Sequence, residues 1–339
     1  MSDTPTIPAD APPGSGRKPW PVKLSLFSGA ALGVLYGILL RFASDIPPFI
    51  KEHANGTMTL SFLAAGPLFI GFLVVYIAER AELRGIWSWF VAPWLAILTT
   101  AAITALFRIE GSICIVFAMP ILLFFSSVGG LLGGLVARRF AVKGNAIACL
   151  ALLPFLLAPA ETHLPTPTQI RTVESEIRIH SSALTVWRSV ERVSAISPSE
   201  MRTTWAQRIG FPRPVEATLS YEGVGGIRHA SFEHGLLFLE TVTAWESERR
   251  LAFGIRADTA HIPPTTLDEH VTIGGLYFDV LDGEYRLQVL PNGDTLLHLT
   301  SHQRLSTDFN GYAGFWSDAV MRNLQTSILE VIRHRCERA

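Results

Sequence analysis

The chain of 339 residues is 49% hydrophobic, has a mean hydropathy of +0.32 and carries a formal net charge of −1. This composition favours a membrane protein over an ordinary soluble one. Residues 171–339 hold 17 Arg and 21 acidic side chains, and a net acidic half argues against a nucleic-acid-binding surface, which needs a net basic face.

The apolar residues are concentrated in the first half of the chain. Residues 1–22 are polar and rich in proline, which predicts a disordered tail. Residues 23–162 then hold five apolar segments near the length of about 20 residues that a membrane-spanning helix needs, so we expect a transmembrane bundle of about five helices. The predicted spans are Leu24–Leu40, Thr59–Ala78, Trp87–Phe107, Ser112–Val136 and Asn145–Ala160.

The charges between these segments predict their orientation, because cytoplasmic loops carry an excess of Lys and Arg. With the N-terminus inside, the inner segments hold eight basic residues and the outer segments three. We therefore expect a cytoplasmic tail, an inner or plasma membrane location, and a second half outside the cytoplasm, in the periplasm of a bacterium. The fifth segment is short and interrupted by Pro154 and Pro159; a re-entrant fifth helix would place the second half in the cytoplasm instead.

Small residues recur at helical spacing in the first predicted span, at Gly29, Gly33 and Gly37. This spacing lets helix backbones approach closely in lipid. It predicts packing within the bundle, with a homodimer through the same face as the alternative. No acidic residue or histidine lies in the middle of a predicted span, which argues against a transporter or pump.

The second half has the composition of a soluble domain, joined to the bundle by a linker at residues 163–170. Alternating apolar residues predict a strand at Val173–Ile179. Helical spacing predicts short helices at Ser182–Val193, capped by Ser181 or Ser182, and at Ser199–Ile209.

The rest of this half predicts a β-meander and one long helix. About six antiparallel strands are expected between residues 216 and 305, with turn signals at Glu233–Gly235 and Pro291–Asp294. A helix from about Gly314 to Arg335 closes the chain. Its apolar stripe is Trp316, Val320, Leu324, Ile328 and Val331.

Residues 171–339 resemble a known superfamily along consecutive strands. The residues that carry the resemblance are Gly223–Phe232, Gly235, Phe238, Glu240, Val242–Glu246 and Arg249–Phe253. They are similar to the START-like or SRPBCC helix-grip superfamily, of the polyketide cyclase/dehydrase and lipid-transport type. The resemblance implies an α+β domain whose antiparallel sheet wraps the C-terminal helix, with a cleft for an apolar ligand between them. We recognise no family in the bundle.

Ten side chains are expected near this cleft as ligand-binding candidates. They are Arg228, Phe232, Phe238, Glu240, Trp245, Phe253, Tyr277, His298, Phe315 and Trp316. Arg228 and Glu240 would hold a ligand head group, or each other in a cross-strand ion pair. The aromatic residues would line the cleft or fill the core. Residues 258–275 would form a lid over the cleft or a plain loop.

No metal site or cofactor is predicted. Cys114, Cys149 and Cys336 form no paired motif. His298 and His302 share one face of a strand about 13 Å apart, too far for one ion.

Three hypotheses about function follow, because the fold alone does not select one. The leading one is a membrane-tethered binding protein that holds an apolar or amphipathic small molecule, plausibly a lipid. The second is a cyclase/dehydrase-type enzyme, in which a histidine of the cleft or the Arg228–Glu240 pair would perform acid–base chemistry on a polyketide-like substrate. The third is a sensor or assembly module that binds another protein.

Overall fold

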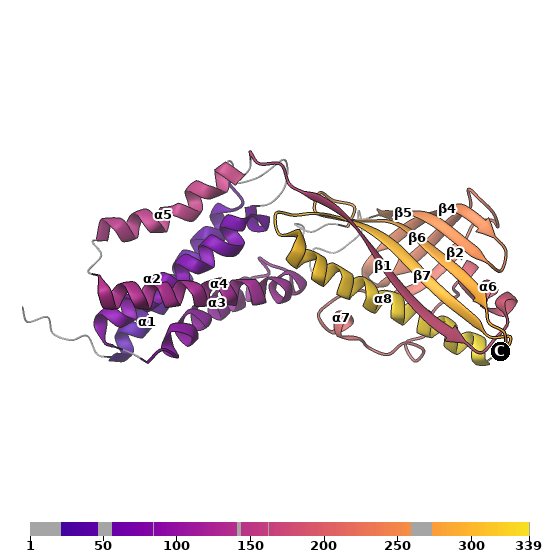
Figure 1. The fold of residues 1–339 in the computed structure, drawn as a ribbon, viewed down its shortest axis with the longest axis horizontal. Coiled ribbons are helices and arrows are strands. Elements are labelled where there is room, and N and C mark those ends of the chain that lie inside the picture. Colours follow the sequence, from indigo (N-terminus) through magenta and orange to yellow (C-terminus); the bar gives the residue numbers. More distant parts are fainter. Residues whose placement is uncertain are drawn as a thin grey trace, which may run out of the picture.

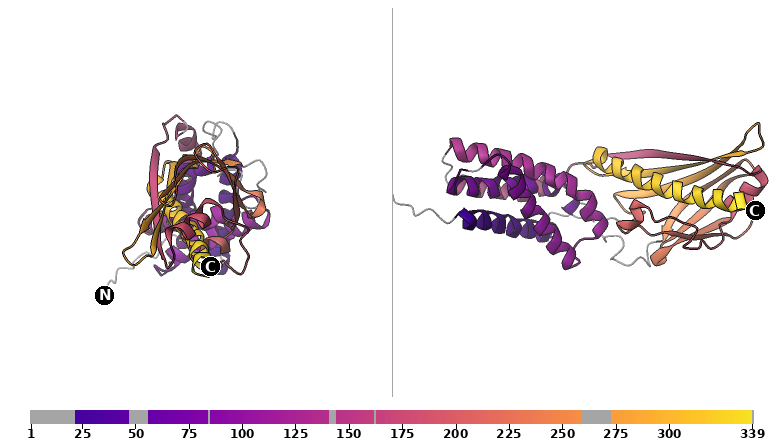
Figure 2. Two further views of the ribbon diagram at one scale, coloured as in Figure 1. Left: turned by 90° about the vertical axis from the view of Figure 1, so that its right-hand side faces the viewer. Right: turned by 90° about the horizontal axis from the view of Figure 1, so that it is seen from below.

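In the computed structural model, the chain folds into a helical bundle and an α+β domain that meet end to end (Figures 1 and 2). The structure describes residues 22–46, 56–83, 85–140, 144–161, 163–258 and 273–338. The predicted disordered tail, apart from Val22, and most of the predicted lid at 258–275 lie outside these residues. Both ideas therefore stay predictions.

Five helices form the bundle, at the five positions expected from apolar composition. They are α1 (Val22–Ala43), α2 (Gly66–Ala81), α3 (Ser88–Leu106), α4 (Ser112–Arg139) and α5 (Gly144–Glu161). Two short turns, η1 (Gly56–Met58) and η2 (Ser61–Ala65), precede α2, and η2 continues directly into it.

The prediction of five membrane spans is wrong in number. Among the described residues, three helices are long and apolar enough to cross a membrane, namely Ser61–Ala81, Ser88–Leu106 and Ser112–Arg139. The described apolar stretches of the other two helices, Phe27–Ala43 of α1 and Asn145–Glu161 of α5, are shorter than these three.

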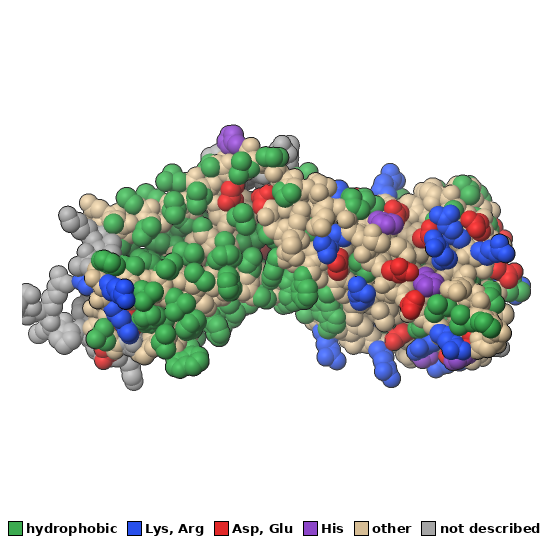
Figure 3. Space-filling view, viewed as in Figure 1, with side chains coloured by type: hydrophobic (Ala, Val, Ile, Leu, Met, Phe, Trp, Pro, Cys, Tyr) green, Lys and Arg blue, Asp and Glu red, His purple; other side chains and the backbone are tan. Residues whose placement is uncertain are grey.

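The face of the bundle seen in Figure 3 is mostly apolar between its ends. Large side chains such as Phe27, Leu95 and Phe124 are 77%, 51% and 63% exposed. A continuous apolar surface of this kind is rare on soluble monomers. It is compatible with a membrane protein whose bundle is surrounded by lipid.

The inner part of the bundle is held together by a glycine seam between α2 and α4. A Cβ atom on Gly71 would lie 1.9 Å from the carbonyl oxygen of Ser126, and one on Gly129 would lie 1.8 Å from that of Leu68. No side chain fits at these distances, so the two backbones approach closely only because these residues are glycine.

The glycines of α1 also pack inside this chain. A Cβ on Gly29 would lie 3.0 Å from the carbonyl oxygen of Val74 on α2, and one on Gly37 would lie 3.1 Å from Thr100 on α3. The glycine face of α1, for which the sequence predicted packing within the bundle or a homodimer, therefore contacts α2 and α3 of the same chain.

A buried polar group joins α2, α3 and α4 at the end of the bundle away from the α+β domain. The side chain of Glu79 is 0% exposed, and it accepts hydrogen bonds from Trp89 Nε1 at 2.6 Å and Arg138 Nε at 3.1 Å. The Arg138 guanidinium lies 4.5 Å from the centre of the Trp89 ring. The buried carboxylate thus has the charged and hydrogen-bonded partners that burial requires.

The second half is a seven-stranded antiparallel sheet wrapped on one long helix, α8 (Asn310–Arg338) (Figure 1). The strand order is β1-β7-β6-β5-β4-β3-β2. The strands are β1 (Thr168–Ile179), β2 (Pro214–Leu219), β3 (Ile227–Phe232), β4 (Leu237–Glu246), β5 (Arg250–Asp258), β6 (Phe278–Val289) and β7 (Thr295–Ser306). The predicted helix-grip architecture is confirmed, with a turn η3 (Glu233–Gly235) between β3 and β4.

Two short helices follow β1, and one is shorter than expected. α6 (Ala183–Glu191) is capped by Ser182, whose side chain accepts the Thr185 N–H. The second helix, α7, covers only Trp205–Arg208 and begins at a capping box of Thr204 and Gln207. Strand β1 begins inside the expected linker, because Thr168 already pairs with Ser306 on β7.

The solid core of this domain lies under the last turns of α8. There, Leu329, Val331 and Ile332 are 1–2% exposed. Leu329 and Ile332 belong to a cluster with residues of α6 and of the central strands. The second half of α8 therefore closes the sheet at the end far from the bundle.

Candidate functional site

The first half of α8 lines an internal cavity of about 360 Å³. Small-molecule sites typically enclose about 300–1,000 Å³ and are lined mostly by apolar groups, and both conditions hold here. The lining side chains from the α+β domain include Phe232, Phe238, Tyr277, Phe278, Tyr312, Trp316, Val320 and Leu324.

The same cavity continues into the helical bundle. Its lining there comes from the ends of α1, α2 and α3 nearest the α+β domain and from the first turns of α4. The bundle residues include Gly37, Leu63, Ile70, Ile97, Ala101, Ile113, Phe117 and Leu122. The hollow thus lies between the two halves of the chain and belongs to both.

Aromatic contacts connect the bundle and the α+β domain beside this cavity. The rings of Phe117 on α4 and Trp316 on α8 stack with centroids 4.9 Å apart, and Phe211 lies 6.0 Å from Phe117. The Tyr312 hydroxyl donates a hydrogen bond to the Phe117 carbonyl. Large rings at these positions bridge α4 and α8 without filling the space behind them.

The lining offers few groups for acid–base chemistry. Among the described lining residues, the charged ones are Arg41 and Glu110, which pair with each other. Burial raises the pKa of Tyr277, which keeps its hydroxyl neutral. The lining described here holds no histidine, so a general base of the usual kind is missing from it.

Four of the ten predicted site residues line the cavity: Phe232, Phe238, Tyr277 and Trp316. The predicted apolar stripe of α8 divides at this point. Its first three residues, Trp316, Val320 and Leu324, face the cavity, whereas Ile328 packs against the solid core and Val331 is buried elsewhere under α8.

Arg228 and Glu240 lie outside the cavity and pair with each other. They face one another across β3 and β4, with Arg228 Nη1 2.6 Å from Glu240 Oε2. The Arg228 guanidinium lies 5.5 Å and 5.7 Å from the ring centres of Phe253 and Tyr285. Burial raises the pKa of Glu240, and the charge of Arg228 opposes that rise. Of the two roles considered for this pair, the geometry shows the cross-strand ion pair.

The other four candidates also lie away from the cavity. Trp245 packs edge-on against Trp187 at 5.1 Å, and Phe253 is buried in the solid core. His298 contacts Glu174 at 3.1 Å on the far face of the sheet, and Phe315 is 64% exposed. These positions depend on the register and curvature of the sheet, which alternation alone does not reveal.

The bundle residues of the lining were not anticipated from the sequence. Phe117 and Ile113 look like ordinary apolar residues of a membrane helix, and nothing in their spacing marks a ligand site. The one available signal was the polar pair Arg41 and Glu110 at the ends of apolar segments, since charged residues beside a span point to function.

Histidine and acidic side chains do not converge on a metal site in the part of the chain that the structure describes. His302 Nδ1 instead lies 2.6 Å from Asp282 on the adjacent strand. These residues therefore form local pairs across the sheet.

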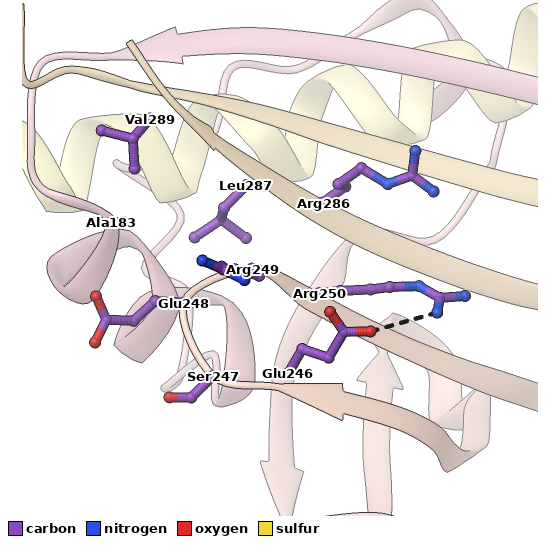
Figure 4. Close-up of a pocket in the computed structure, with 9 residues that line it drawn as sticks. All are labelled: Ala183, Glu246, Ser247, Glu248, Arg249, Arg250, Arg286, Leu287 and Val289. Atoms are coloured by element: carbon purple, nitrogen blue, oxygen red, sulfur yellow. Dashed lines mark ion pairs between the residues drawn. The ribbon is translucent and has the colours of Figure 1, made fainter. Parts of the chain in front are cut away.

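A second, open hollow of about 590 Å³ lies at the β4–β5 turn, at the far end of the sheet (Figure 4). Within the lining, Arg250 lies 3.6 Å from Glu246, and Arg250 and Arg286 also pair with Glu284 of β6, which lies outside the lining. Exposed ion pairs of this kind stabilise a turn by little. Nothing at this turn recognises a ligand beyond ordinary solvated charges.

Comparison with known proteins gives matches of fold for about half of the chain. No family model matches, and no curated protein matches the sequence. Solved structures that match include a START superfamily protein from Mycobacterium smegmatis (11% identity, TM-score 0.32, 49% of this chain and 97% of that chain) and the Zhui aromatase/cyclase from Streptomyces sp. R1128 (16%, 0.33, 50% and 95%). A truncated norcoclaurine synthase from Thalictrum flavum also matches (12%, 0.31, 51% and 96%).

The TM-scores of these matches are low, at 0.31–0.33. At this level of identity the matches concern the fold alone, and the activities of those proteins do not transfer to this chain.

Proposed function

We propose that this protein is a membrane-anchored binding protein that holds an apolar or amphipathic small molecule, of lipid type, in the cavity between its two halves. The observation that carries the proposal is the cavity itself, which has a volume of about 360 Å³, lies between α8, the sheet and the bundle, and is lined mainly by aromatic and aliphatic side chains. Burial of apolar ligand surface there would supply about 25 cal/mol per Å² before the costs of association.

The charge distribution supports an orientation with the α+β domain outside the cytoplasm. Arg80, Arg138 and Arg139 lie in the last turns of α2 and α4, at the end of the bundle away from α8. By the positive-inside rule that end faces the cytoplasm. Because α5 leads from that end of the bundle back to the α+β domain, this orientation has α5 cross the membrane as well. The cavity would then lie at the outer surface of an inner or plasma membrane, next to its lipids.

A binding role fits the lining better than a cyclase-type reaction. Acid–base catalysis needs a titratable group positioned on the substrate. Among the residues that the structure describes, the titratable groups that line the cavity are few, and the two charged ones, Arg41 and Glu110, pair with each other. The buried Arg228–Glu240 pair, which an enzyme hypothesis would use, lies behind the lining and is committed to holding β3 and β4 together.

Native mass spectrometry of the full chain, released gently from membranes, tests the proposal. We expect a bound molecule that extraction identifies as a lipid. Val320→Trp should reduce its occupancy at least tenfold, because Val320 lines the cavity, whereas Val289→Trp should not, because Val289 is 62% exposed on β6. An empty wild-type chain that also takes up neither a fatty acid nor a lysophospholipid would refute the proposal.

A further inference from the structure

The cavity has two arms that meet where the halves of the chain join. The grip arm lies beside α8 from Phe309 to Ser327, and the bundle arm lies beside α4 from Ile113 to Leu122. At about 1.5 Å per residue these stretches measure about 27 Å and about 14 Å. A volume of about 360 Å³ spread over such a length makes the cavity long and narrow. Its shape therefore suits one extended chain rather than a compact ligand.

The bundle arm reaches well into the apolar interior of the bundle. Its deepest lining includes Ile70 and Ile97, which are 3% and 4% exposed and belong to the core cluster of α2 and α3. This depth is unusual for a soluble binding domain, whose cavity would end at its own surface. Here the apolar lining continues from the α+β domain to the level of the hydrocarbon.

Among the described lining residues, the charged side chains Arg41 and Glu110 lie at the level where the arms meet. Arg41 stands near the end of α1 and pairs with Glu110, from the loop between α3 and α4, and with Asp45 at 2.6 Å. The Arg41 side chain is only 4% exposed, so the cluster is built into the structure and is not a solvated surface pair. A polar group placed here would find charged partners, whereas either arm offers mainly apolar contacts.

The outside of the junction carries exposed apolar side chains. Trp205, Leu276 and Phe315 are 39%, 49% and 64% exposed. Trp205 and Phe315 both contact the lining residue Trp316, with ring centroids 6.5 Å and 5.3 Å away. Tryptophan, like tyrosine, is enriched at the membrane–water interface. We therefore place the junction of the two arms, with Trp205 on its outside, at the depth of the lipid headgroups.

We infer that the ligand is a single-chain amphiphile taken directly from the outer leaflet of the bilayer, with the bundle as its entry route. The chain passes through the bundle arm into the grip arm, and the polar group stays beside Arg41 and Glu110. This inference rests on the proposed function and adds the ligand class, the route and the position of the polar group. It makes the bundle part of the binding site rather than a simple anchor.

Photolabelling of the full chain in phospholipid vesicles tests the inference. The probe is a palmitoyl lysophosphatidylcholine with a diazirine at the chain end, and labelled residues are mapped by mass spectrometry. We expect labels along α8 between Phe309 and Ser327 and, in a smaller fraction, along α4 between Ile113 and Leu122. Ala101→Phe, which narrows the bundle arm, should lower the α8 labelling at least fivefold. Ala102→Phe is the matched control, because Ala102 is exposed on the adjacent face of α3.

The outcomes distinguish a failure of the bundle route from a failure of the binding function. Undiminished α8 labelling in a folded Ala101→Phe chain overturns the bundle route but leaves the binding function standing. If the wild-type chain is labelled on α8 but not on α4, the bundle route is also overturned, and this result needs no variant. If no residue of the cavity is labelled and native mass spectrometry also finds an empty chain, the proposed function itself is overturned. If Ala101→Phe does not fold, Leu122→Trp narrows the same arm from α4 and gives the same readout.

Discussion

The bundle and the α+β domain are each tightly packed at the far end and hollow where they meet. In the bundle, the second half of α4 packs on α2 through glycines, whereas its first turns line the cavity. In the α+β domain, the second half of α8 buries Leu329 and Ile332 in the core, whereas its first half lines the same cavity. Two helices of 28 and 29 residues thus each serve packing at one end and the candidate site at the other.

The difference between the two ends lies in the side chains that meet there. Glycine and branched aliphatic residues allow backbones and side chains to interdigitate without voids. At the junction, Phe117, Tyr312 and Trp316 contact each other ring to ring instead. These large rigid side chains hold α4 and α8 together at their rims and leave apolar space behind them. The cavity therefore results from these large aromatic side chains at the junction and not from poor packing.

The largest effect is expected from breaking the buried ion pair in the solid part of the sheet. Glu240→Ala leaves Arg228 charged and unpaired in an apolar site, which should cost about 3–5 kcal/mol of unfolding free energy. The double variant Arg228→Met/Glu240→Leu should lose less than Glu240→Ala alone, because neither charge remains buried. Denaturant titration of the purified chain measures both. Equal stability of Glu240→Ala and wild type would mean that the pair is not buried as described.

A matched pair of truncations on α8 contrasts its two halves directly. Leu329→Ala opens a void in the core and should cost about 2–5 kcal/mol. Val320→Ala enlarges an existing cavity and should cost under about 1 kcal/mol, while changing ligand occupancy. Thermal unfolding with and without bound lipid distinguishes the two. Similar losses of stability in both variants would contradict the division of α8 into a packed half and a cavity-lining half.

The glycine seam gives the corresponding contrast in the bundle. Gly129→Ala brings a methyl group against the Leu68 carbonyl and should destabilise the bundle by about 1–3 kcal/mol through overpacking. Gly85→Ala is the control, since a Cβ at Gly85 meets nothing within 4 Å. The two variants are compared by unfolding the chain in detergent with increasing amounts of SDS. A seam that tolerates Gly129→Ala as well as Gly85→Ala would not be as close as the structure indicates.

The smallest effect concerns an acid-sensitive contact that fastens α8 to the loop before α7. Hydrogen bonds from Arg335 and from the Ser197 N–H lower the pKa of Glu200 from 4.5 to about 2. Because the folded-state pKa is the lower one, this contact stabilises the fold above about pH 4.5 and is lost as the pH falls toward 2. Glu200→Gln should therefore remove about 0.2–1 kcal/mol at neutral pH and flatten the pH dependence in this window. Unfolding curves from pH 7 to pH 2.5 test this, and a slope unchanged by the substitution would contradict it.

Local patterns in the sequence determined the parts of this protein. Apolar runs located all five bundle helices, and turn signals located the hairpins at Glu233–Gly235 and Pro291–Asp294. Ser182 was correctly predicted as one of two possible caps for α6. Each of these features depends on residues a few positions apart, so periodicity and capping chemistry suffice to find them.

Only the tertiary structure decided how those parts combine into a site. The junction brings Tyr312 onto the Phe117 carbonyl across 195 residues of sequence, and no local pattern encodes that contact. Sheet register turned Arg228 and Glu240 toward each other, and pairing with β7 extended β1 back to Thr168. Whether an aromatic residue fills a core or lines a hollow depends on the distance between the elements around it. That distance is set by packing across the whole chain, which is why the cavity emerged only with the fold.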